Sequence, residues 1–187
     1  MSDLKVAGFA GSLRKNSLNR LLLRSAIDLA PPGMTIEELD IQDIPLFNAD
    51  LEEDSTPESV LLLKRAIETA DGLLVISPEY NWGIPAVTKN IIDWCSRRVS
   101  EPANVLMNKP VSIMSIAAGR GTGALVRAQI RQVLVYPKAV TMPSGDVGIS
   151  GGISNFDENG KLSDETTITQ VKNNLSDFAD WILKTSA

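Results

Sequence analysis

Hydroxyl, amide and basic side chains are concentrated in one short stretch near the start of the chain. It reads GSLRKNSLNR and offers Ser12, Ser17 and Asn19 as hydrogen-bond donors and Arg14 as a cation. The residues before it, 5–10, fit a buried strand, and the apolar positions after it recur at helical spacing. A loop between a strand and a helix start presents unpaired backbone N–H groups and the positive end of the helix dipole. Such a loop predicts a phosphate site.

The glycine pattern of this loop differs from the two common phosphate motifs. Gly8 and Gly11 fit neither the Walker pattern nor the G-x-G-x-x-G dinucleotide fingerprint. Side-chain donors in place of a glycine-rich nest favour a single terminal phosphate monoester over a pyrophosphate. The alternative is an ordinary helix start with Ser17 or Asn16 as the N-cap residue, and the loop alone does not decide between the two.

A second unusual loop follows the apolar run Gly72–Ile76. It reads SPEYNWGIP and combines two prolines, two aromatic rings and a carboxylate. The rings of Tyr80 and Trp82 suit a flat ligand, although they would also serve as simple loop packing. A third loop, rich in glycine, follows the apolar strand predicted at 110–116.

The amino-acid composition excludes several kinds of catalytic site. The chain has no histidine and one cysteine, Cys95, among its 187 residues. This removes Ser-His-Asp and Cys-His nucleophilic sites, CxxC pairs and intrachain disulfides, and we predict no metal site. Cys95 stands in an apolar helical context, which favours core packing over nucleophilic chemistry.

Charge and hydropathy narrow the class of protein further. A net charge of -5 argues against nucleic-acid binding, which favours a basic face. The sequence lacks an apolar run of about 20 residues that would span a membrane. The first five residues lack the build of a signal peptide. These features favour the cytoplasm as the location. The length of 187 residues favours a single domain over residues 1–187.

Strands and helices are predicted to alternate along the chain. Expected strands are 5–10, 34–40, 72–76, 110–116 and 139–142. The first expected helix begins at Ser17 and includes Ile27, and further helices are expected at 57–70, 85–96, 124–133 and 163–184. Expected loops include 41–57 and 146–160. The pattern predicts an α/β, flavodoxin-like three-layer sandwich, in which a five-stranded parallel sheet of order 2-1-3-4-5 has helices on both faces. The loops after the first and third strands meet at the switch point of such a sheet. A phosphate loop beside a slot for a flat ring favours a flavin mononucleotide (FMN) site.

The motifs GSLRKNSLNR and SPEYNWGIPAVTKNIIDWCSR closely resemble those of the NADPH-dependent FMN reductase family. That family has a flavodoxin-like fold and includes quinone, azo-dye and chromate reductases. The resemblance covers most of the chain and weakens beyond Gly145. It implies that the first motif binds the FMN phosphate and that the second wraps the isoalloxazine ring. The resemblance maps the phosphate contacts onto Ser12, Arg14, Ser17 and Asn19 and the ring contacts onto Pro78, Glu79, Tyr80 and Asn81. The full predicted cofactor-binding set adds Leu13, Leu18 and Trp82 from the same two loops, and Ser115, Ala117 and Gly119 from the third loop.

The resemblance also implies a reaction. NADPH or NADH would transfer a hydride to FMN, and a quinone or a similar small acceptor (FMN, an azo compound or chromate) would then be reduced by two electrons in a ping-pong cycle. Because the flavin carries the chemistry, no side chain is assigned as a catalytic acid or base. The competing hypothesis is a flavodoxin-type electron-transfer protein without substrate turnover. The mild acidity of a chain with 18 basic residues favours the enzyme.

The chain departs from the family in the loop after the fourth strand. Relatives often carry Gly-Gly-x-Arg there, whereas Leu125 occupies the arginine position, with Arg120 and Arg127 nearby. The resemblance further implies a homodimer or homotetramer in which the partner subunit helps to wall the pocket. The candidate contact residues are the aromatic side chains Phe47, Tyr80, Trp82 and Trp94.

Overall fold

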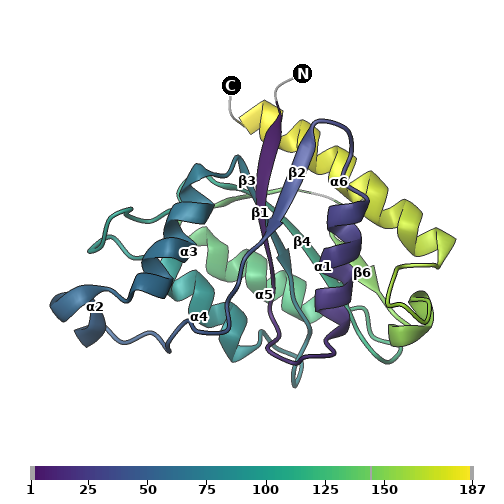
Figure 1. Ribbon diagram of the computed structural model, residues 1–187, viewed down its shortest axis with the longest axis horizontal. Helices are drawn as coiled ribbons and strands as arrows, with labels where there is room; N and C mark the ends of the chain where they lie inside the picture. The colour runs from purple at the N-terminus through teal and green to yellow at the C-terminus, as the bar shows by residue number, and fades with distance from the viewer. Residues whose placement is uncertain (1–2, 144, 186–187) are drawn as a thin grey trace.

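A parallel sheet forms the middle layer of the protein in the computed structural model, which describes residues 3–143 and 145–185 without the side chains of residues 53 and 54 (Figure 1). Its strands are β1 (Leu4–Ala10), β2 (Met34–Glu38), β3 (Gly72–Ile76), β4 (Pro110–Ile116), β5 (Val140–Thr141) and β6 (Val147–Ile149). The order β2-β1-β3-β4-β5 confirms the predicted flavodoxin-like topology. The ends of the predicted single domain, residues 1–2 and 186–187, lie outside the described residues.

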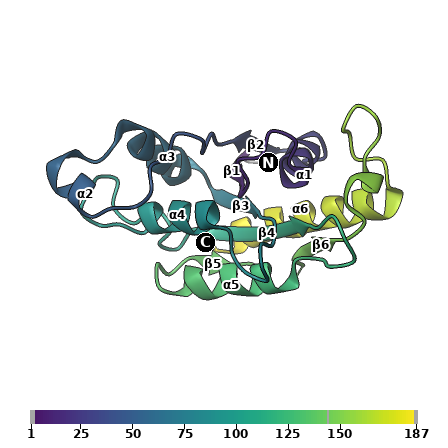
Figure 2. The same cartoon turned by 90° about the horizontal axis from the view of Figure 1, so that it is seen from below.

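Helices cover both faces of the sheet (Figures 1 and 2). One face packs against α1 (Leu18–Asp28) and α6 (Glu165–Thr185), and the other packs against α3 (Glu58–Thr69), α4 (Ala86–Cys95) and α5 (Ala124–Val135). Side chains of β3 alternate between the two apolar clusters, which explains why the strand is a continuous apolar run. In the described part of the chain, no helix is long and apolar enough to cross a membrane.

Three elements lie in segments that were expected to be loops. The connection 41–57, expected to be irregular, contains α2 (Asp50–Ser55), and the expected loop 146–160 contains β6 and a short 3-10 helix, η1 (Gly152–Asn155). All three elements are too short to show a periodic pattern. β6 also has glycine at its centre, which weakens a strand signal. The remaining elements begin and end within two residues of the predicted bounds.

The short strands β5 and β6 continue one another along the free edge of β4. β5 pairs with the start of β4, and β6 pairs with its carboxyl end, where Ser115 lies opposite Gly148. Arg131 supports the segment between them, because it donates hydrogen bonds to the Met142 carbonyl at 2.6 Å and to the Asp146 carboxylate. The sheet therefore has six strands in the described residues, one more than expected.

The loops after β1, β3 and β4 leave the sheet side by side at its carboxyl end, the lower end in Figure 1. The Gly11 N–H donates to the Ile76 carbonyl at 2.7 Å, and the Ser77 N–H donates to the Met114 carbonyl at 3.0 Å. A Cβ on Gly11 would lie closer to the Thr88 hydroxyl than van der Waals contact allows. The first loop is therefore pressed directly against the start of the second.

Asn19 joins α1 to the carboxyl end of β4. Its buried side-chain amide donates to the Ile116 carbonyl at 3.0 Å and accepts from the Ile116 N–H at 3.1 Å. Both polar groups of one backbone residue are thus satisfied by one side chain. This contact gives Asn19 a positioning role, because it joins the start of α1 to the end of β4.

We expect Asn19→Ala to lower the free energy of unfolding by about 2–3 kcal/mol, because it leaves the buried Ile116 N–H and carbonyl without partners. Urea denaturation followed by circular dichroism measures the loss. The matched control is Asn16→Ala on the exposed tip of the same loop, which should change stability by less than about 0.5 kcal/mol. If Asn19→Ala is as stable as the control, the hydrogen bonds between Asn19 and Ile116 do not contribute to stability.

Candidate functional site

The start of α1 is open toward the carboxyl end of the sheet. Ser17 occupies the N-cap position with an extended backbone, and among the described residues its hydroxyl makes no capping hydrogen bond. The first-turn N–H groups therefore lack the side-chain partner that usually satisfies them. The first turn also contains no acidic residue. An anion with several acceptor oxygens fits this arrangement, and the helix dipole favours its charge.

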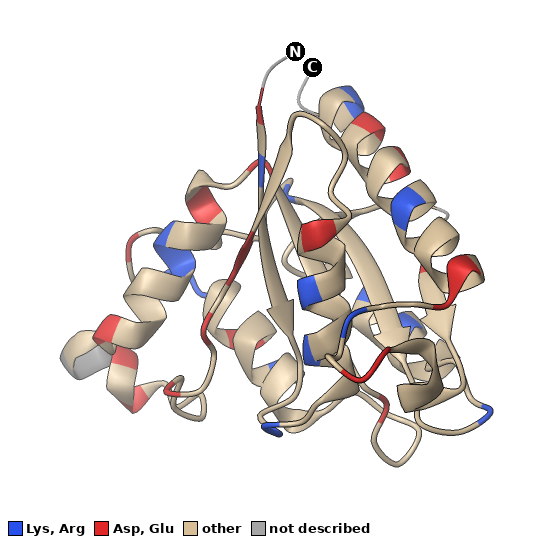
Figure 3. Ribbon diagram, turned by 45° about the vertical axis from the view of Figure 1, so that its right-hand side comes forward, with Lys and Arg blue, Asp and Glu red and all other residues tan. Residues whose placement is uncertain are grey.

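Hydroxyl and basic side chains surround this helix start. Ser12 is buried, and its Oγ lies 3.3 Å from the Tyr80 hydroxyl and accepts a long hydrogen bond from the Arg14 N–H. Leu13 and Arg14 are exposed, and the tip of the loop between β1 and α1 is basic (Figure 3). Leu18 is the first residue of α1 and packs against the core cluster under the helix. The donor set fits the phosphate monoester of FMN.

The loop after β3 forms a tight turn at its aromatic tip. Tyr80 and Gly83 exchange backbone hydrogen bonds of 3.1 and 2.9 Å. The two residues between them, Asn81 and Trp82, have φ angles of 50° and 61°, the signs of a type I′ turn. A left-handed backbone is unusual for a residue as large as tryptophan. The side chain of Trp82 is 78% exposed at the tip.

Gln129 of α5 forms hydrogen bonds with the backbone of this turn. Its Oε1 accepts from the Ile84 N–H at 2.9 Å, and its Nε2 donates to the Trp82 carbonyl at 3.2 Å. One side chain therefore fixes both the tip and the far side of the turn. Sequence reasoning missed Gln129, because a single glutamine in an amphipathic helix carries no motif.

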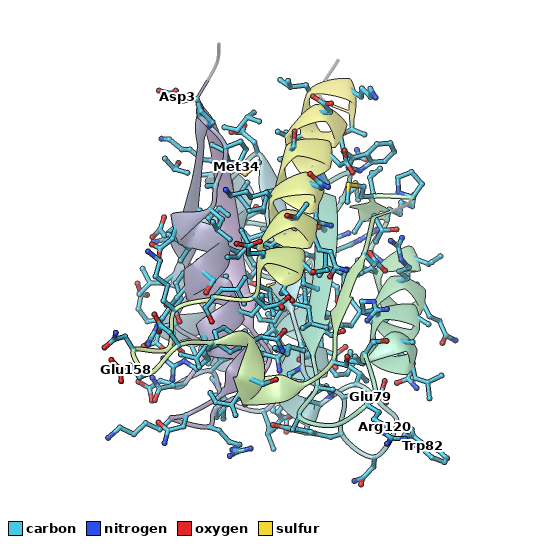
Figure 4. All side chains as sticks on the ribbon, turned by 90° about the vertical axis from the view of Figure 1, so that its right-hand side faces the viewer. Asp3, Met34, Glu79, Trp82, Arg120 and Glu158 are labelled. Atoms are coloured by element: carbon cyan, nitrogen blue, oxygen red, sulfur yellow. The ribbon has the colours of Figure 1, made fainter. Side chains whose placement is uncertain are left out.

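Glu79 connects the second loop to the start of α5. Its Oε2 accepts hydrogen bonds from the N–H groups of Leu125 and Val126, both at 3.0 Å. These groups belong to the first turn of α5, whose N-cap residue is Gly123 and therefore has no side chain to offer. The carboxylate thus caps α5 from another element and opposes the positive end of its dipole. Figure 4 shows Glu79 and Trp82 together with Arg120 at one end of the molecule.

The third loop is held to β6 and α5. The Ala117 N–H donates to the Ile149 carbonyl at 3.0 Å, so it is committed within the protein. The Ser115 hydroxyl is buried and donates to the Thr122 carbonyl at 2.6 Å. Around Gly119, by contrast, a Cβ would meet open space among the described residues. Of the three predicted residues here, Gly119 borders the open edge, and the other two position the loop.

A groove of about 670 Å³ lies between the first loop, the long connection after β2 and the start of α4. Leu13, Ile44, Leu46 and Val87 contribute apolar walls, and the Tyr80 side chain lies at one end. Leu46 is 76% exposed. The groove therefore places apolar surface next to the phosphate-side loop.

Asn90 fixes the wall of the groove that the long connection supplies. Its Oδ1 accepts from the Phe47 N–H at 2.7 Å, and its Nδ2 donates to the Pro45 carbonyl at 2.9 Å. Trp94 is fully buried and donates its indole N–H to the same carbonyl at 2.8 Å, while its ring packs edge-on against Phe47 at 5.0 Å. Two of the four predicted contact aromatics, Phe47 and Trp94, are therefore engaged in their own domain.

The site offers binding groups rather than an acid–base pair. No cluster of metal-ligating side chains occurs in the described residues. Cys95 is fully buried on α4, and burial raises the pKa of its thiol to about 12, which confirms its assignment to the core. A flavodoxin-like sheet with an uncapped helix start and an aromatic turn at its switch point is the architecture of a protein that holds a phosphorylated planar cofactor.

Comparison with known proteins identifies the family. The family model described as NADPH-dependent FMN reductase matches residues 4–153. The chain is 38% identical over 180 residues to an NAD(P)H-dependent FMN reductase of Pseudomonas aeruginosa, covering 96% of each. It is 36% identical over 183 residues to a quinone reductase of Escherichia coli K12, and the aligned region covers 96% of this chain and 95% of that relative.

A solved structure shows the same relationship. FerB, a flavoenzyme NAD(P)H:(acceptor) oxidoreductase from Paracoccus denitrificans, is 35% identical and superposes with a TM-score of 0.88, covering 97% of this chain and 98% of that chain. The chain belongs to the NADPH-dependent FMN reductase family. It is an NAD(P)H-dependent oxidoreductase with FMN as its cofactor, as the motifs predict.

We expect Trp82→Gly to change the free energy of unfolding by less than about 1 kcal/mol, because relief of the left-handed backbone offsets the greater freedom of glycine in the unfolded chain. The matched control is Tyr136→Gly, an equally exposed aromatic residue with a right-handed backbone. It should lose about 1 kcal/mol, since it gains no such relief. Equal losses in urea denaturation would show that the turn stores no strain.

Proposed function

We propose that the enzyme reduces quinones and similar small acceptors with electrons from NADPH or NADH, in a ping-pong cycle on FMN held at the carboxyl end of the sheet. The observation that carries this proposal is the uncapped start of α1 beside the Tyr80–Gly83 turn at one switch point. The first feature suits a phosphate, and the second suits a planar ring. The acceptor class is supported by the quinone reductases among the relatives.

The phosphate end of FMN would be held by the residues around the start of α1. The hydroxyls of Ser12 and Ser17 supply side-chain donors, and the N–H groups of the first turn supply backbone donors. Arg14 supplies positive charge at the rim. When bound, FMN accepts a hydride from the nicotinamide and passes two electrons to the acceptor.

The ring end would lie between the second and third loops. The Tyr80–Gly83 turn, fixed by Glu79 and Gln129, presents a rigid aromatic wall. The space around Gly119 is open, so the third loop, on the opposite side of the ring, can approach a ligand closely. Because these loops are held by hydrogen bonds within the protein, the site is preorganised before any substrate arrives.

We also propose that the enzyme is a homodimer at least, with the apolar groove near the subunit contact. Leu13, Leu46 and Tyr80 line this groove and are exposed, and large exposed apolar side chains that lie together mark contact surfaces. A second copy over this groove would complete the wall around the ring. A cytoplasmic location remains a prediction.

We expect Ser17→Ala to weaken FMN binding about tenfold and to leave riboflavin binding nearly unchanged, because only FMN carries the phosphate and one charged hydrogen bond is worth roughly 1.5–3 kcal/mol. Fluorescence titration of both flavins measures the two affinities. The control is Ser25→Ala on the same helix, because the Ser25 hydroxyl donates to the Leu21 carbonyl within the helix. Equal losses for FMN and riboflavin would place the phosphate elsewhere.

The single slot over the ring predicts ping-pong kinetics. Reciprocal plots of rate against NADPH concentration at several quinone concentrations should be parallel, and high quinone should compete with NADPH. Steady-state assays with both nicotinamides and a panel of quinones test this. Intersecting plots would require separate sites, and a holoprotein that passes electrons only to another protein would favour an electron carrier.

The assembly proposal is tested by Leu46→Asp, which places a charge in the groove. Sedimentation velocity across a dilution series should show twice the chain mass for the wild type and a shift toward the single-chain mass for the variant. Leu62→Asp is the control, because Leu62 is also exposed but lies on α3, outside this groove. A fully active wild-type monomer would contradict a shared site.

A further inference from the structure

Arg127 points from α5 into the space behind the third loop. Its Nη1 donates to the Ser115 hydroxyl at 2.7 Å and also to the Thr122 carbonyl. Ser115 in turn donates to the same carbonyl at 2.6 Å. The guanidinium therefore lies at the carboxyl end of β4, directly under the loop that borders the proposed flavin site.

The charge of Arg127 has no directly paired carboxylate among the described residues. The neighbouring acids are committed to other groups. Asp146 makes two hydrogen bonds to Arg131, at 2.9 and 2.6 Å, and Glu79 caps α5. Burial lowers the pKa of the Arg127 guanidinium, partly opposed by Asp146 and Glu79. Arginine nevertheless remains protonated in proteins, so the group is a half-buried cation with neutral hydrogen-bond partners.

Two glycines leave room for this arrangement. A Cβ on Gly148 of β6 would collide with the Arg127 guanidinium. At Gly123, φ is +67° and a Cβ would lie 2.6 Å from Ser115 Oγ, so a larger residue would push the loop off the serine. The cation is therefore part of the local packing rather than a surface side chain that happens to fold inward.

We propose that the fixed positive charge of Arg127 favours the anionic, reduced form of FMN at the site. The inference rests on the proposed FMN site. Addition of one hydride brings two electrons and one proton to the neutral ring, which leaves one negative charge until a further proton binds. A cation held in a partly desolvated position stabilises that charge more than it stabilises the neutral oxidised ring.

The test is the two-electron reduction potential of bound FMN in Arg127→Gln, measured anaerobically against a reference dye. We expect the affinity for reduced FMN to fall about tenfold relative to oxidised FMN, which lowers the potential by about 30 mV. Arg127→Lys keeps the charge and should restore most of the potential. The control is Arg65→Gln on α3, which removes the same net charge from an exposed position and should leave the potential unchanged.

A second variant separates charge from loop position. Ser115→Ala removes the hydrogen bond to the loop but leaves the cation, so its potential should stay close to that of the wild type. If Ser115→Ala and Arg127→Gln lower the potential equally and lysine does not rescue it, Arg127 acts only by holding the loop, and the inference is overturned. An unchanged potential in Arg127→Gln overturns it as well.

Oxidised-FMN titration of the wild type keeps this inference distinct from the proposed function. Absence of binding would overturn the FMN site and the inference with it, whereas binding with an unchanged potential in Arg127→Gln overturns the inference alone. Where Arg127→Gln does not fold by circular dichroism, Arg127→Met gives the same comparison, because it keeps an unbranched stem of similar length and lacks the charge.

Discussion

The site depends on the buried bridge between the Asn19 amide and the backbone of Ile116. This one side chain satisfies both polar groups of the residue at which β4 ends. It fixes the start of α1 relative to the strand from which the third loop departs. Because an unpaired polar group in this position would be costly, the helix start has little freedom to shift. The phosphate-side donors and the ring-side loops are therefore held in a constant relation.

A second set of contacts extends this constraint to the remaining loops. Glu79 satisfies two N–H groups of α5, and Gln129 of the same helix returns two hydrogen bonds to the turn that follows Glu79. Donors that face the inside of the protein are thus paired with protein acceptors, while the first turn of α1 is left without a side-chain cap. Of these two helix starts, the one that is free of a carboxylate, at α1, is the better suited to an external anion.

The order of the main strands and the faces covered by helices could be predicted, because the underlying patterns extend over enough residues to be recognised. The continuous apolar run of β3 is an example. The two loops at the switch point were also predictable, because their composition is unusual. The roles of single side chains were not. Asn19 and Glu79 are predicted to bind the cofactor, and the structure adds that each also joins two elements, through residues that are 97 and 46 positions apart in sequence. Such pairings depend on tertiary geometry, and the local sequence carries no signal of it. α2 and β6 were missed because three to six residues cannot establish a period.

The burial of Cys95 has a consequence for chemical durability. Quinones are electrophiles that alkylate thiols, and the attacking species is the thiolate. With a pKa of about 12 for this thiol, roughly one molecule in 100,000 carries a thiolate at pH 7, and the sulfur is fully enclosed. The chain contains no other cysteine. The protein therefore presents no reactive thiol that an arylating compound could modify.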